Sequence, residues 1–158
     1  MQEGNVNKKR LIRLLILHVV FLAVLGCGLS AKSDYQKALQ ENLNAYADAF
    51  LDFAGAMQDV EINANTLNDE VWVTDVKTKL DAIQSAGNAL GSIEDVPEEY
   101  VVIDDLMKLI KLETTELVNN FNQGLDSEDI GMIETAVGNM DAVQGYLDQA
   151  ADQIEALK

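Results

Sequence analysis

Hydrophobic side chains recur every three or four residues along most of the chain after residue 34, which is the spacing of an amphipathic α-helix. In the first such stretch the apolar positions alternate between intervals of four and three, as in a coiled-coil seam. Its apolar positions are Leu39, Leu43, Tyr46, Phe50, Phe53 and Met57. Ser33 and Gln36 match a capping box, so we expect this helix to begin near residue 34.

Two more stretches with the same spacing follow residues 58–68, which are polar with isolated apolar positions. Their Asn-rich part, residues 63–66, predicts a loop. The second helix is expected to end at Gly91 and to bury Trp72, Val76, Leu80, Ile83, Gly87 and Leu90. The third is expected to begin with Pro97 in its first turn and to end at Gly124 in a left-handed cap. Its apolar face is Tyr100, Ile103, Met107, Ile110, Leu117 and Phe121.

The last helix, expected from residue 130 to the C-terminus, follows a seven-residue repeat. We name four of its rows. The first apolar row is Ile130, Val137, Gln144 and Ala151, and the second is Ile133, Met140, Leu147 and Ile154. The glycine row is Gly131, Gly138 and Gly145. The acidic row is Glu134, Asp141, Asp148 and Glu155. Both apolar rows are expected to be buried, together with Ala136, Val143 and Ala150.

Glycine inside an exposed helix costs roughly 1 kcal/mol relative to alanine, so a row of three invites an explanation. One interpretation is a bare strip of backbone where a partner or ligand comes close, which makes the glycine and acidic rows a candidate contact surface. The other is glycine tolerated in a helix held by tertiary packing, or close packing against a neighbouring helix of the bundle.

Four long amphipathic helices with connections of two to ten residues favour an all-α protein, and we expect an antiparallel up-down-up-down four-helix bundle. No stretch has the alternating period of a β-strand over a useful length.

The segment before these helices differs in character. Lys8, Lys9 and Arg10 precede a twelve-residue apolar run over residues 14–25. A membrane-spanning helix needs about 20 apolar residues, whereas the hydrophobic core of a secretory signal needs about 7–15. The run ends in Val24-Leu25-Gly26-Cys27, and Cys27 is the only cysteine of the chain.

This ending resembles the lipobox of bacterial prolipoproteins. The resemblance implies cleavage after Gly26, acylation of Cys27 and an extracytoplasmic body attached to the membrane by lipid. It divides the chain into a signal peptide over 1–26, a lipidated cysteine and tether over 27–33, and a helical bundle over 34–158. The alternative is an uncleaved anchor helix over about 11–29, which would place Arg13 and His18 in the bilayer at a cost.

Residues 72–100, with the stretch Val96-Pro97-Glu98-Glu99-Tyr100, also resemble small secreted helical lipoproteins of Gram-positive bacteria. That resemblance implies a fold and a location. It implies no activity and transfers no site residues.

Charge narrows the functional classes. The chain has a net charge of −16, and residues 27–158 hold 7 basic and 26 acidic residues, a net of −19. Nucleic-acid binding needs clustered Lys and Arg, so we expect none. The body has no histidine, which excludes a Ser-His-Asp site there. We therefore expect no enzyme activity, no cofactor and no metal site.

Local groups of acids, including Glu98, Glu99, Asp104 and Asp105, are interpreted as solvated residues near helix starts rather than cation sites. Trp72, Tyr46, Phe50 and Phe53 are either a ligand pocket between helices or simply part of the core. The sequence thus favours a non-enzymatic surface lipoprotein that presents an acidic bundle for contact with a basic or cation-bridged protein. The alternative is an extracytoplasmic binding protein for a small cationic or apolar ligand held between the helices.

Overall fold

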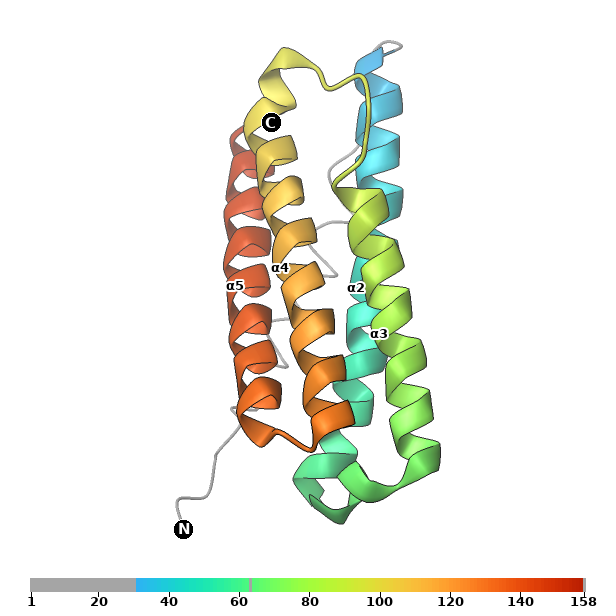
Figure 1. Ribbon diagram of the computed structural model, residues 1–158. Helices are drawn as coiled ribbons and strands as arrows, with labels where there is room; N and C mark the ends of the chain where they lie inside the picture. The colour runs from blue at the N-terminus through green and yellow to red at the C-terminus, as the bar shows by residue number, and fades with distance from the viewer. Residues whose placement is uncertain (1–30, 63, 158) are drawn as a thin grey trace.

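The computed structural model describes residues 31–62 and 64–157, which are helical apart from short connections. Four long helices lie side by side, and their connections fall at alternate ends of the bundle (Figure 1). They are α2 (Ala31–Ile62), α3 (Glu70–Leu90), α4 (Val101–Ser127) and α5 (Ile130–Ala156). Two 3₁₀ turns, η1 (Ala64–Asn68) and η2 (Glu98–Tyr100), precede α3 and α4. The prediction of an all-α bundle is confirmed, and the described residues form no strand.

The predicted apolar seams form the core. In α2 the seam residues are buried except Met57, which is half-buried against the core. The six predicted residues of α3 and the six predicted in the third stretch are all buried. Helical periodicity therefore identified the inward faces of the first three helices correctly.

Several predicted helix ends need correction. Helix α2 already includes residues 31–33, which were expected to be tether, and it ends at Ile62, directly before the loop predicted over residues 63–66. Pro97 does not begin α4 but caps η2, and α4 starts at Val101. Gly124 is not a left-handed cap, because it lies buried inside α4, and the left-handed residue at the end of this helix is Glu128, with a φ of 56°. At Gly124 an added Cβ would lie 2.7 Å from Ile133 Cγ1, so glycine there allows α5 to approach α4.

The side chains of Asp69 and Asp129 cap the N-termini of α3 and α5. Asp69 Oδ1 accepts hydrogen bonds from the backbone N–H groups of Val71 at 2.9 Å and Trp72 at 3.3 Å. Such caps satisfy donors that the first turn of a helix leaves unpaired. The same arrangement recurs at Asp129, so both helix starts are encoded locally.

One polar contact joins three helices inside the core. Thr114 of α4 donates its hydroxyl to the Ile110 carbonyl at 2.7 Å, so the 2.6 Å contact with Tyr46 Oη of α2 is a hydrogen bond donated by the tyrosine. From α3, Gly87 faces the same threonine, and a Cβ there would lie 3.0 Å from Thr114 Cγ2. Burial raises the pKa of the Tyr46 hydroxyl and keeps it protonated.

We predict that Thr114→Val lowers the free energy of unfolding by about 1–3 kcal/mol, because valine keeps the shape but leaves Tyr46 Oη buried without an acceptor. Urea unfolding of the full chain measures the change. The matched control is Thr78→Val on the exposed side of α3, where the hydroxyl bonds only to its own helix. An equal loss in both variants would contradict the proposed role of the Tyr46–Thr114 contact.

Candidate functional site

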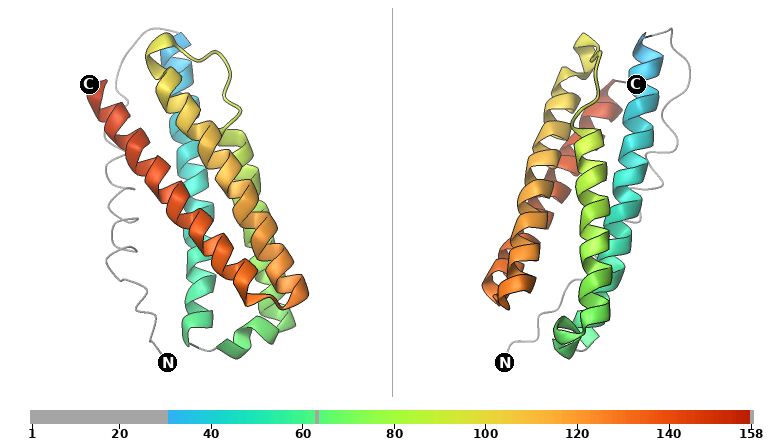
Figure 2. Two further views of the ribbon diagram at one scale, coloured as in Figure 1. Left: turned by 60° about the vertical axis from the view of Figure 1, so that its left-hand side comes forward. Right: turned by 45° about the vertical axis from the view of Figure 1, so that its right-hand side comes forward.

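Helix α5 makes its most extensive contact with α4. Ala136, Val143 and Ala150 are fully buried, and their small side chains let the two helices lie close together. Figure 2 shows α5 crossing the other helices at an angle and diverging from α4 towards its C-terminal end. Because Ala136, Val143 and Ala150 face α4, the rows on the opposite side of α5 face away from the bundle.

The order of the other rows around α5 follows from helical geometry, since successive residues are about 100° apart around the axis. Going outward from the core, the second apolar row is followed by the first apolar row, then the acidic row, then the glycine row. We call the last three rows the outer face of α5. The acidic row runs along its middle, between apolar side chains on one side and bare backbone on the other.

The first apolar row was expected to be buried, and this is wrong. Ile130 is 63% exposed and Val137 is 43% exposed, while Gln144 and Ala151 are half-buried. In the second row Leu147 is buried, and Ile133, Met140 and Ile154 pack partly against the core. Because α5 turns its alanines towards α4, the first row is rotated away from the centre of the bundle.

The glycine row faces open space. Among the residues that the structure describes, an added Cβ at Gly138 or Gly145 would meet no atom within 4 Å apart from its chain neighbours and the local helix backbone. At Gly131 it would meet only the side chain of Asp129, the residue that caps α5. These glycines therefore do not serve close packing against a neighbouring helix of the described bundle, which leaves a contact surface or glycine tolerated in a helix held by tertiary packing.

The acidic row is exposed at all four positions. Asp148 accepts a hydrogen bond from Gln144 Nε2 at 2.9 Å, one turn earlier on the same helix. Between residues 130 and 156 the chain has five acidic residues and no Lys or Arg. The outer face thus carries negative charge that its own helix does not balance.

Basic residues are placed elsewhere. Five lysines form ion pairs with acids of α2, α3, α4 or η2, and they are Lys32, Lys37, Lys77, Lys79 and Lys108. Two of these pairs join separate elements: Lys32 with Glu99 at 2.9 Å, and Lys77 with Asp126 at 2.5 Å. The distribution of lysines makes α5 the most one-sided helix of the bundle in charge.

The predicted aromatic pocket residues lie in the core. Tyr46 and Phe50 stack with ring centroids 6.1 Å apart, and Phe53 meets Phe121 edge to face at 5.2 Å. Trp72 Nε1 donates to the Ala56 carbonyl at 3.1 Å, so its polar group is satisfied within the bundle. All four predicted residues are at most 8% exposed, and these contacts give each of them a packing role.

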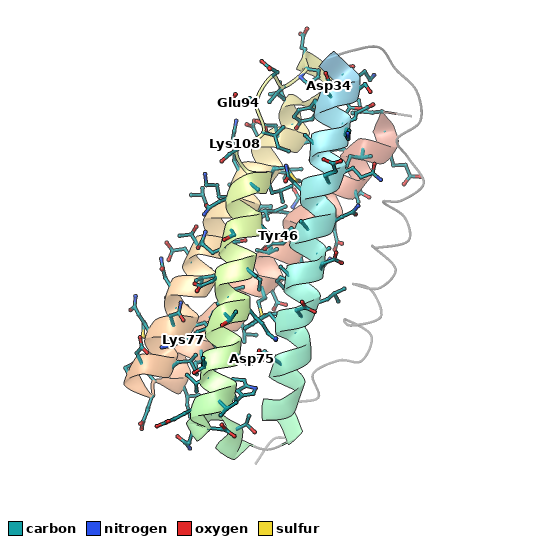
Figure 3. The ribbon with its side chains drawn as sticks, turned by 90° about the vertical axis from the view of Figure 1, so that its right-hand side faces the viewer. Asp34, Tyr46, Asp75, Lys77, Glu94 and Lys108 are labelled. Carbon is teal, nitrogen blue, oxygen red and sulfur yellow. The ribbon has the colours of Figure 1, made fainter. Side chains whose placement is uncertain are left out.

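A cavity of about 610 Å³ lies near the other end of the bundle from Trp72. It is formed by Asp34, Tyr35, Ala38 and Asn42 of α2, Ala89 of α3, and residues 92–95 of the following connection. Figure 3 shows Asp34 and Glu94 near one end of the molecule and Asp75 and Lys77 towards the opposite end. Sequence reasoning missed this cavity, because its walls come from separate segments that share no local pattern.

The expectation for Asp104, which lies near this end of the bundle, also needs correction. It was interpreted as a solvated acid, but it is only 3% exposed. Its Oδ2 pairs with Lys108 Nζ at 2.7 Å, and this contact raises the pKa of the lysine. Asp104 Oδ1 and Tyr35 Oη are both buried without a hydrogen-bond partner within the described chain. Burial raises the pKa of Tyr35, with a further contribution from the charge of Asp104.

Across residues 31–62 and 64–157, no three His, Cys, Asp or Glu side chains are grouped so as to hold a metal ion. Nor is any helix in these ranges both long and apolar enough to cross a membrane. Cys27 and the predicted signal segment lie outside the described residues. Comparison with known proteins finds no matching family model, no similar curated protein and no similar solved structure.

We predict that Gly138→Ala and Gly145→Ala each raise the free energy of unfolding by roughly 1 kcal/mol, because alanine favours the helix and the new methyl group has room. Thermal or urea unfolding of the full chain measures this. Gly124→Ala is the contrasting variant and should destabilise, since its Cβ would lie 3.0 Å from the Asp129 carbonyl oxygen. Destabilisation by Gly138→Ala would mean that the outer face is covered.

Proposed function

We propose that this protein is a non-enzymatic lipoprotein of the bacterial cell surface that binds another protein through the outer face of α5. The observation that carries the contact role is the exposure of that face. Its glycine row has open space above it, its acidic row is exposed, and Ile130 and Val137 remain accessible at its apolar edge. A helix whose only task was to close the bundle would be expected to bury this apolar row.

The anchor part of the proposal rests on the sequence. The basic residues before a short apolar run, followed by Leu25-Gly26-Cys27, support signal-peptide cleavage and acylation of Cys27. Stable attachment to a bilayer needs more than one acyl chain, which a bacterial lipoprotein cysteine would provide. In this proposal the signal helix is removed and an up-down-up-down bundle remains outside the cytoplasmic membrane.

The negative charge of the body would affect its orientation at the membrane surface. The segment from residue 27 onward has a net charge of −19, so an anionic leaflet and anionic wall polymers repel it. The tether between Cys27 and the start of α2 is only a few residues long, so the repulsion orients the bundle more than it separates it from the membrane. The same charge favours a partner surface that is basic or bridged by cations.

A second candidate function is supported by the cavity between the first part of α2 and the connection from α3 to α4. Its walls include Asp34, Glu94 and Asp95 together with apolar side chains, a combination that suits a small organic cation. Saturable binding of such a cation in calorimetry, lost in Asp34→Asn with Asp95→Asn and retained when the acidic row is neutralised, would favour this alternative.

The proposed function predicts two outcomes in bacterial cells that produce the full chain with a photoreactive residue in place of Gly138. The protein should be in the membrane fraction, and illumination should give a discrete protein adduct, because the outer face is expected to contact a partner. Fractionation followed by immunoblotting measures both outcomes.

Two variants provide the controls. Cys27→Ala should move the protein out of the membrane fraction or leave it as an unprocessed precursor. A photoreactive residue at Asp81, exposed on α3, should not give the adduct obtained at Gly138. Full membrane retention of mature-sized Cys27→Ala would contradict the anchor, and absence of an adduct specific to Gly138 would contradict the contact role.

A further inference from the structure

We infer that the partner element bound by the outer face of α5 is an amphipathic α-helix with an apolar stripe and Lys or Arg side chains at seven-residue intervals. This inference rests on the proposed contact function and specifies what the contact recognises. Its basis is the apolar edge left exposed on α5 and the negative charge beside it.

The apolar edge is a continuous strip rather than two scattered residues. Ile130 and Val137 are exposed, and they lie next to Ile133 and Met140 of the second apolar row. These two residues are half-buried and lie on the side nearer the core. The strip occupies the N-terminal half of α5, where Asp129 caps the helix and fixes its first turn. A partner that covers the strip would complete the burial of side chains that are already partly removed from water.

The repeat along α5 favours a helical partner. Seven residues of an α-helix advance about 10.5 Å. The acidic row repeats at that interval along α5, and Ile130 and Val137 of the apolar strip are separated by one such interval. A helix with its own heptad repeat matches this spacing over its whole length. A β-strand presents one face about every 6.6–6.8 Å, so its side chains would fall out of step with the rows after one repeat.

Charge selects a basic partner and disfavours a second copy of this chain. Helix α5 has five acidic residues and no basic ones, while five lysines of the described chain are paired with acids on other elements. Two copies packed through this face would bring two acidic rows together. A helix with Lys or Arg beside its apolar stripe would place opposite charges along the same line, as flanking positions do in coiled coils.

The glycine row completes the fit. With no side chains at Gly138 and Gly145, the long aliphatic stems of Lys or Arg can lie across the backbone of α5 while their charged ends reach the acidic row. Substitution of Gly138 and Gly145 by Gln should obstruct these stems without adding charge. Because a Cβ at either position has open space, such variants should retain the fold.

The test uses the purified full chain in detergent and a synthetic four-heptad helical peptide with a leucine stripe flanked by lysine and arginine. Fluorescence anisotropy of the labelled peptide should show saturable binding that weakens with salt. Neutralising the acidic row with Glu134→Gln, Asp141→Asn, Asp148→Asn and Glu155→Gln should weaken binding about tenfold, as expected for several exposed ion pairs. The glycine-row variants should weaken it as well.

The matched control removes four exposed acids elsewhere, with Asp52→Asn, Asp81→Asn, Glu98→Gln and Glu116→Gln. It carries the same change in net charge and should leave binding within about twofold of the parent at physiological salt, where distant charges are screened. A second peptide has the same composition, with its basic residues scrambled so that no stripe forms.

Equal binding of the scrambled peptide would overturn the helix inference while leaving an acidic contact surface in place. Equal loss of binding in both charge variants would overturn the assignment to α5. Absence of binding by the heptad peptide would overturn the inference, and the proposed contact function would still be judged by cross-linking at Gly138. Self-association of the chain that is lost in the glycine-row variants would show that a second copy occupies the face.

Discussion

The bundle depends on the contact of Thr114 with Tyr46 and Gly87 in the middle of the core. Each of these three residues comes from a different helix, and Thr114 contacts both of the others. The threonine hydroxyl accepts from Tyr46, and its methyl group needs the space that glycine leaves on α3. A buried polar pair of this kind is costly when either partner is lost, so it fixes the relative register of α2, α3 and α4 more firmly than apolar packing alone.

Helix α5 is then placed by a different principle. It packs along α4 through small side chains, with Gly124 allowing close approach of Ile133 near the connection. Because the single row formed by Ala136, Val143 and Ala150 is fully buried, Ile130 and Val137 are turned outward. The exposed apolar edge, the acidic row and the open glycines thus follow from one choice of packing row, and the contact function we propose uses what that choice leaves exposed.

Sequence patterns predicted the inward faces of the first three helices because each seam is set by local spacing, as from Leu39 to Phe53. They also predicted the start of α5 near Asp129, where the cap is a local hydrogen bond. They failed for Ile130 and Val137, since the heptad leaves two adjacent rows equivalent and only the position of α4 separates them. They failed for Gly124 and Asp104, whose surroundings come from other segments. Of the candidate sites, the glycine and acidic rows were recognisable from the heptad pattern, whereas the exposed apolar edge and the cavity beside Asp34 were not.

The proposed contact function requires that the glycine row of α5 faces outward and is uncovered in the native protein. Alkylation kinetics of single introduced cysteines in the full chain, followed by mass spectrometry to assign each thiol, measure this directly. We predict that Gly138→Cys reacts nearly as fast in native buffer as in urea, and that Val143→Cys, at a fully buried position of the same helix, reacts only on unfolding. Protection of Gly138→Cys comparable to that of Val143→Cys would show that the glycine row is covered and would contradict the proposed contact face.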